Sequence, residues 1–250
     1  MDFDRFIKNI LAIEDLEGTD PSLNGVQVGD LNKEIKKVAL AVDASIESFR
    51  RAFEQKADLL FVHHGLLWSK QKRITGNLYH RIQTLITTGL VLYAVHLPLD
   101  MHPELGNNIG IAKQLGLKKI TPFGVYKGVK IGYKGILSEP ASLDTIKEKL
   151  FIKNGSSLGI LPFGPEKINS IGIVSGGDPK SGLQAIEEGL DLFITGDASH
   201  ELYHECLEGK INVIFAGHYA TEVWGVRQMA EKIKKSTDCE VVLIDIPTGL

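Results

Sequence analysis

Residues 213–226 read VIFAGHYATEVWGV, and this stretch combines the main signals of the fold. Its first half predicts a buried strand, Gly217 ends that strand, and a helical pattern then begins and continues through EVWGVRQMAEKI. His218 and Glu222 lie four residues apart where the strand passes into the helix. Strands that alternate with helices in this way are typical of α/β proteins.

The same alternation occurs twice along the chain. Val38 matches Ile171 and Asp58 matches Asp191, in both cases at an offset of 133 residues. The third strand matches at an offset of 122 residues, with VLYAVH against VIFAGH. Strands are predicted within 36–45, 57–65, 90–100, 169–178, 190–199 and 211–222, and helices within 45–56, 77–89, 181–189 and 200–209. We therefore predict two similar α/β modules that arose by duplication.

The predicted division places residues 1–124 in the first α/β domain and residues 125–250 in the second, with the boundary near Thr121–Gly128. The second domain carries an inserted segment, residues 125–151, with its own strand and a helix capped by Ser142 and Asp144. A ligand is expected at the carboxyl ends of the strands, because loops converge there in open α/β sheets.

Composition excludes several classes of protein. The chain has 250 residues, 43% hydrophobic and 24% charged, with a formal net charge of −3, so no overall basic field indicates nucleic acid. Its two cysteines form no CxxC pair, which argues against a disulfide framework and against a thiolate zinc site. No apolar run approaches the roughly 20 residues that span a bilayer. We expect a cytoplasmic protein that does not enter membranes.

The residues that could bind metal all follow predicted strands. The histidines are His63, His64, His96 and His218, and the carboxylates Asp100 and Glu222 each stand four residues after a histidine. Imidazole nitrogen and carboxylate oxygen without thiolate suit zinc, iron, manganese, cobalt or nickel. The alternatives are a structural role for any single histidine, and for Glu222 a place in the first turn of a helix capped by Thr221.

The spacing within this set predicts two ions and not one. Adjacent residues of a strand point to opposite faces, so if both stay extended His63 and His64 do not readily serve a single ion, and one ion per histidine fits better. A carboxylate such as Glu222 could bridge two ions, as two-metal hydrolytic sites often require. Pro98 predicts a loop for HLPLD, so the spacing from His96 to Asp100 is not a helical face.

A second glycine-rich stretch, VSGGDPKSG at 174–182, also runs from a strand into a helix. Such turns can present backbone amides to phosphate, but the stretch lacks the GxxxxGK[ST] spacing of a P-loop. The interpretation we favour is a tight turn that needs the conformational freedom of glycine.

Four motifs give the chain a family resemblance: NGVQVGD (24–30), FVHHGLLW (61–68), AVHLPLDMHPELGNN (94–108) and AGHYATE (216–222). They resemble the Ngg-interacting-factor-three-like family, often labelled GTP cyclohydrolase I type 2 homologue, over essentially the whole chain. The resemblance implies two α/β domains, two divalent metal ions per chain in the cleft, and a ring-shaped homohexamer built as a trimer of dimers.

The resemblance also implies the ligands, which fall on His63, His64, Asp100, His218 and Glu222, with Glu222 as the bridge. It places His96 close to the metals, as a residue that supports the ligands. The first motif departs from the family pattern at Leu23-Asn24 and Val26, which leaves the role of that loop open.

We predict a metal-dependent hydrolase of a nucleotide or similar small substrate, with His96 and Glu104 as candidates for an otherwise unassigned general base. The alternative is a ring-shaped DNA-binding or regulatory protein with structural metals. Local lysine clusters, among them Lys118 and Lys119, could line the hole of such a ring although the chain is acidic.

Overall fold

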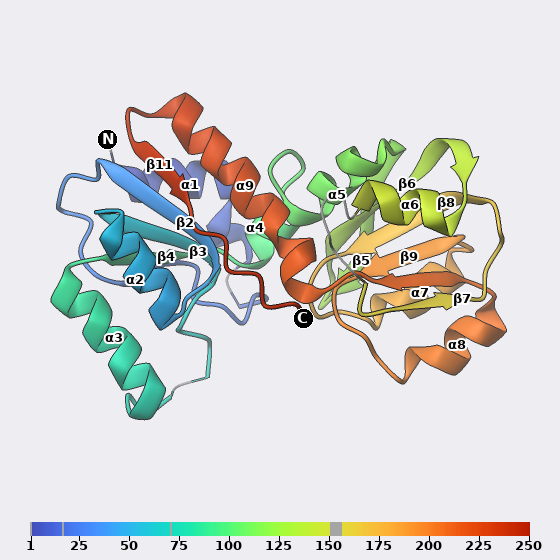
Figure 1. Ribbon diagram of the computed structural model, residues 1–250, viewed down its shortest axis with the longest axis horizontal. Helices are drawn as coiled ribbons and strands as arrows, with labels where there is room; N and C mark the ends of the chain where they lie inside the picture. The colour runs from blue at the N-terminus through green and yellow to red at the C-terminus, as the bar shows by residue number, and fades with distance from the viewer. Residues whose placement is uncertain (1, 17, 71, 151–156) are drawn as a thin grey trace. The chain divides into compact units, whose positions relative to one another are not determined.

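The computed structural model describes residues 2–16, 18–70, 72–150 and 157–250, and the chain forms two compact units (Figure 1). The first unit combines Met1–Leu99 with Val226–Ile246. The second combines Asp100–Gly225 with Pro247–Leu250. Each unit contains one β-sheet with helices packed on it, which confirms the predicted α/β class.

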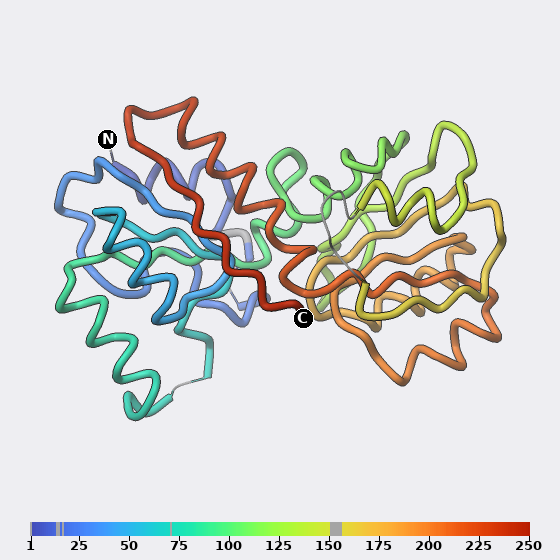
Figure 2. The backbone as a smooth tube through the Cα atoms, in the orientation of Figure 1, coloured from blue at the N-terminus to red at the C-terminus, as the bar shows by residue number. Residues whose placement is uncertain are grey.

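The first unit has a five-stranded sheet in the order β1-β4-β3-β2-β11. Four strands are parallel, and β1 runs antiparallel to β4 at one edge. Figure 2 shows that the C-terminal strand β11 lies beside β2, although the two strands are far apart in the sequence. The strands are β1 (Gly25–Val28), β2 (Lys37–Asp43), β3 (Leu59–His64), β4 (Val91–Ala94) and β11 (Glu240–Leu243).

Helices cover both faces of this sheet because the central strands are apolar on both sides. Phe49, Ala52 and Leu85 from α2 and α3 pack on one face. On the other face Phe3 of α1 meets Tyr93 edge-on, with ring centroids 6.3 Å apart. The helical elements within this unit are α1 (Phe3–Leu11), the 3-10 helix η1 (Ile13–Leu16), α2 (Ile46–Glu54) and α3 (Gly76–Thr88).

The second unit has a six-stranded sheet in the order β5-β6-β8-β9-β10-β7. Strands β8, β9 and β10 are parallel, and β5, β6 and β7 pair antiparallel with their neighbours. Helices α5 and α6 cover one face through Leu115 and Ile146. The strands are β5 (Lys118–Tyr126), β6 (Val129–Ala141), β7 (Gly159–Pro162), β8 (Ile168–Val174), β9 (Leu192–Thr195) and β10 (Asn212–Phe215).

The remaining helices complete the chain. Within the second unit these are α5 (Asn107–Leu115), α6 (Leu143–Leu150), α7 (Ser181–Glu187) and α8 (Leu202–Gly209). Two further helices, α4 (Leu97–Met101) and α9 (His218–Ser236), contain residues assigned to both units. None of the described helices is long and apolar enough to cross a membrane.

The structure supports the predicted duplication in its hydrogen bonds as well as its topology. The order β2-α2-β3-α3-β4 in the first unit recurs as β8-α7-β9-α8-β10 in the second. Asp58 accepts hydrogen bonds from the backbone N–H groups of residues 36–37 at 2.9 and 3.0 Å. Asp191 accepts from those of residues 169–170, both at 2.9 Å. The offset of 133 residues therefore preserves a contact that holds the start of the preceding strand.

The division of the chain differs from the predicted domains 1–124 and 125–250. The stretch Thr121–Gly128 is not a domain boundary, because most of it belongs to β5, which pairs with β6 inside the second unit. At the other end, Glu240 to Leu243 pair with β2, so the C-terminal strand belongs to the first sheet. Backbone pairing decides which sheet a strand joins, and an apolar pattern does not reveal the pairing partner.

The matched carboxylates give a paired test of the duplication. Replacing Asp58 or Asp191 with Ala leaves two backbone N–H groups without their acceptor, so each variant should lose about 2 kcal/mol of unfolding free energy. Urea denaturation of both variants measures this loss. The control is Asp144→Ala: Ser142 and not Asp144 accepts the capping hydrogen bond of α6, and the Asp144 side chain is 85% exposed with only a surface ion pair, so its loss should matter little. A loss at only one of the two positions would contradict an equivalent role.

Candidate metal centre

Three histidines come together at the carboxyl end of the sheet in the first unit. His63 and His64 end β3, and His96 follows β4. Their candidate ligand atoms all lie within 4.8 Å of one another. His63 is fully buried, whereas the side chains of His64 and His96 are 19% and 17% exposed. His96 was expected only to support the ligands, but the structure groups it with His63 and His64 as a candidate ligand itself.

This geometry corrects the expectation that His63 and His64 point apart. Their ring centroids are 4.6 Å apart. His64 is the last residue of β3, and its ring is held by Asp43, with His64 Nδ1 and Asp43 Oδ1 at 2.9 Å. The strand pleat constrains the Cβ directions, but a bond to a neighbouring strand can bring the rings together.

All four predicted histidines use the Nδ1 atom in a hydrogen bond to an oxygen. The acceptors are Val95 O for His63 (3.0 Å), Asp43 for His64 (2.9 Å), Asp20 for His96 (2.8 Å) and Asp197 for His218 (2.9 Å). Carbonyl and carboxylate oxygens accept, so the proton lies on Nδ1 and Nε2 is the atom for a metal. Anchoring of the ring nitrogen opposite the metal is typical of metal-binding histidines.

The first family motif takes part in this anchoring, which settles the role of its loop. Asp20, just upstream of the motif, bonds His96 Nδ1, and Asn24 Oδ1 accepts from the backbone N–H of His96 at 2.8 Å. Asn24 also donates to Asp20 at 2.9 Å. Burial is the largest single influence and raises the pKa of Asp20, but the hydrogen bonds from His96, Asn24 and the Ser22 backbone, together with the charge of His96, outweigh it, so this pKa lies below its usual value. The departures at Leu23 and Val26 leave the contact to His96 intact.

Gln27 fixes the loop that follows the histidine pair. Its Oε1 accepts from the backbone N–H groups of Leu66 and Leu67 at 2.6 and 2.9 Å. A side chain at Gly65 would collide with the Gln27 amide, so this position needs glycine for close approach.

In the second unit, Asp100 lies in the short helix α4 and is 5% exposed. The loop predicted from Pro98 is thus wrong, because proline is tolerated in the first turn of a helix. Asp100 Oδ1 accepts from Asn107 Nδ2 and from Ser175 Oγ, both at 2.9 Å. Two donors on one oxygen hold the carboxylate in place, and Asp100 offers one carboxylate oxygen as a candidate ligand atom.

His218 and Glu222 occupy the first turns of α9. His218 Nε2 and Glu222 Oε2 are 3.2 Å apart, and a ligand oxygen of Asp100 lies within 4.8 Å of one of Glu222. Helix α9 begins at His218, so Thr221 lies inside it and is not its N-cap, and Glu222 is not in its first turn; Glu222 is also only 2% exposed. Hydrogen bonding to Glu222 raises the pKa of His218 to about 9, although burial opposes this.

The turn in VSGGDPKSG packs directly on these side chains. Gly176 has a φ of +65°, and a Cβ there would collide with the Glu222 carboxylate. A Cβ at Gly177 would lie 2.8 Å from Asp197 Oδ2. The structure thus supports the tight-turn interpretation, with a reason beyond backbone freedom: the glycines make room for Glu222 and for the partner of His218.

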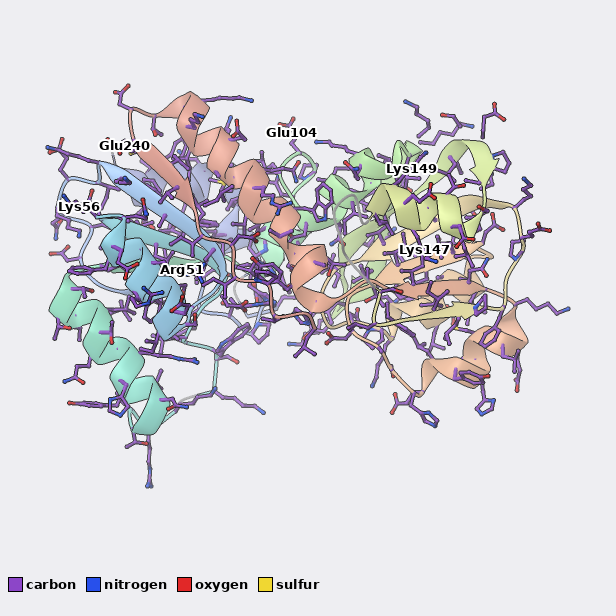
Figure 3. The ribbon with its side chains drawn as sticks, viewed as in Figure 1. Arg51, Lys56, Glu104, Lys147, Lys149 and Glu240 are labelled. Carbon is purple, nitrogen blue, oxygen red and sulfur yellow. The ribbon has the colours of Figure 1, made fainter. Side chains whose placement is uncertain are left out.

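Sequence reasoning missed the carboxylates that hold the imidazoles. A signal did exist: Asp43 precedes His64, and Asp197 precedes His218, by the same 21 residues. Each pair joins the ends of adjacent parallel strands. Of the two candidates for a general base, His96 lies among the ligand atoms, whereas Glu104 is exposed (Figure 3).

The structure is thus that of an α/β protein whose strand ends carry groups of histidines and carboxylates that could hold a metal ion. The model of the Duf34/NIF3 (NGG1p interacting factor 3) family matches residues 1–249. A protein from Archaeoglobus fulgidus, described as a GTP cyclohydrolase 1 type 2 homolog, is 45% identical over 98% of this chain and 97% of its own length. The chain therefore belongs to the Duf34/NIF3 family.

Solved structures agree with this assignment. The protein TTHA1606 from Thermus thermophilus is 38% identical and superposes with a TM-score of 0.87 over 100% of both chains. A protein named ybgI, described as of unknown function, is 30% identical and has a TM-score of 0.88, covering 99% of this chain and 98% of its own.

The close approach of Gly176 to Glu222 predicts that a methyl group added at Gly176 will weaken metal retention. Gly176→Ala should displace the Glu222 carboxylate and weaken metal retention, which metal analysis after dialysis measures. Gly189→Ala is the matched control, because Gly189 has the same φ of +65° but open space around it. That control should cost only about 1 kcal/mol of backbone strain and leave metal retention unchanged. Equal effects of the two variants on metal retention would contradict the collision.

The raised pKa of His218 predicts a pH dependence in the metal-free protein. The folded pKa of about 9 exceeds the unfolded value of about 6.5, so the protonated imidazole stabilises the fold. This contribution is complete below about pH 6.5 and is lost as the pH rises through about 9. Urea midpoints of chelator-treated protein across this window should fall more steeply than those of Glu222→Gln. Parallel curves would rule out coupling between His218 and Glu222.

Proposed function

We propose that this protein binds two divalent metal ions per chain and uses them to hydrolyse a nucleotide or similar small substrate. The observation that carries the proposal is the shared anchoring of four imidazoles through Nδ1, which presents Nε2 as the candidate metal ligand. The proposed ligands are His63, His64, His96, Asp100, His218 and Glu222.

The donor set fits a divalent ion from zinc, iron, manganese, cobalt or nickel. Imidazole nitrogens and carboxylate oxygens suit these ions, and neither cysteine belongs to the described ligand groups. Buried carboxylates such as Asp100 and Glu222 are costly unless they are paired, hydrogen-bonded or coordinated. Glu222 is the proposed bridge, because its two oxygens could each serve one ion.

Each part of the chain has a separate role in this proposal. Ions held by such ligands supply the Lewis acidity that hydrolysis requires. Asp20, Asp43 and Asp197 orient imidazoles, while Ser175 and Asn107 orient Asp100. The protonated His218 of the metal-free protein must release its proton to bind an ion, so ion binding and proton release are coupled.

The comparisons support a nucleotide as the first substrate class to test. The Archaeoglobus relative is described as a homolog of a GTP cyclohydrolase. The homohexamer, DNA binding, the cleft position of the ions and a cytoplasmic location all stay predictions.

Metal content and turnover together test the proposed function. The purified protein should hold about two ions per chain and turn over a member of a nucleotide panel. Glu222→Gln should lose metal and reduce turnover by more than about 100-fold, because even residues behind the ligands contribute roughly 10- to 100-fold. Glu231→Gln, an exposed position on the same helix, is the control and should behave as the unaltered protein.

Two results would count against the proposal. The absence of metal from the unaltered protein, even after reconstitution with each candidate ion, would remove the metal centre. Full metal content with turnover of no nucleotide would leave the metals in place and reject the hydrolase.

A further inference from the structure

Trp68 stands beside the histidines of the first unit and is firmly held there. Its ring centroid is 5.1 Å from that of His96, at an interplanar angle of 76°, and 6.4 Å from that of His64. The indole N–H donates to Gly65 O at 3.2 Å, and the backbone forms an antiparallel bridge with Ser22. The indole nitrogen of Trp68 therefore has a hydrogen-bond acceptor, and the backbone at Trp68 is held by its bridge to Ser22.

Trp68 is partly exposed together with two of the three histidines beside it. Trp68 is only half-buried, and the side chains of His64 and His96 are also partly exposed, whereas His63 behind them is fully buried. Solvent therefore reaches the side chains of Trp68, His64 and His96, and the polar N–H of the indole is already satisfied. What the indole still offers is its apolar ring surface.

A fixed and partly exposed indole is suited to one kind of contact. Planar heteroaromatic rings stack on tryptophan with little dependence on their identity, because each ring presents a π-face. A sugar or a phosphate alone has no such face. The position beside two candidate metal ligands would hold the ring of a substrate close to the site of reaction.

We propose that Trp68 is a specificity-determining residue that stacks on a planar heteroaromatic ring of the substrate. The inference rests on the proposed function for the reaction and for the nucleotide class of substrate, and adds the residue that would recognise the heteroaromatic ring of that substrate. The competing role for Trp68 is packing alone, in which the indole supports His96 and contacts no ligand.

Matched probes separate these roles. Binding of guanosine monophosphate and of ribose phosphate to the metal-loaded protein is measured by calorimetry, since the two probes differ by the ring. The unaltered protein should bind the ring-bearing probe about 10-fold more tightly. Trp68→Ala should lose this preference, and Trp68→Phe should keep most of it. Trp224→Phe, which alters the other tryptophan, is the control and should keep it fully.

Metal content of every variant is measured in parallel, so the inference and the proposed function can fail separately. An unaltered protein without ring preference, or a metal-replete Trp68→Ala variant that retains the preference, overturns the role of Trp68 whatever the turnover. Ring preference that depends on Trp68 in a protein without turnover would reject the hydrolase and leave the stacking role standing.

If Trp68→Ala does not fold, a second measurement tests the inference without that variant. Trp224→Phe leaves Trp68 as the sole tryptophan, so its fluorescence reports directly on stacking. Guanosine monophosphate should quench this fluorescence at concentrations where ribose phosphate does not. Equal responses to the two probes would overturn the inference.

Discussion

The hydrogen bond that each site histidine makes through Nδ1 is the constraint on which the site depends. Without it, an imidazole at a strand end could rotate and exchange its proton between two nitrogens. Asp43, Asp20 and Asp197 hold three of the rings, and the carbonyl of Val95 holds the fourth. Much of the surrounding structure positions these acceptors. The side chain of Asn24 donates a hydrogen bond to Asp20, and Asp43 is the last residue of β2.

Duplication explains why both units orient a histidine with an aspartate but carry different residues at the matching positions. In the first unit, an aspartate at the end of β2 holds a histidine at the end of β3. In the second unit, an aspartate after β9 holds a histidine after β10, and the turn after β8 contains two adjacent glycines. The position that corresponds to Asp43 is Gly176, where a side chain would collide with Glu222. One scaffold therefore presents mainly imidazoles and the other adds buried carboxylates.

The pattern of the chain predicted the main elements because apolar periodicity follows directly from burial on a sheet. Strands β2, β3, β4, β8, β9 and β10 lie where alternation and apolar runs predicted them. The predictions from sequence were wrong where contacts distant in the sequence, and not the local pattern, decided the structure. Pro98 predicted a loop but occupies the first turn of α4. The domain boundary was predicted near Thr121–Gly128, but that stretch contains most of a paired strand.

The sequence by itself determined the α/β class, the internal repeat and the residues that could bind metal, because these follow from composition and from positions at strand ends. Only the tertiary structure decided that β11 joins the first sheet, that His63 and His64 converge, and that Glu222 is buried. It also revealed the carboxylates behind the imidazoles, which lie 21 to 76 residues away in the sequence. Contacts at such separations depend on strand pairing, and strand pairing leaves no local pattern in the chain.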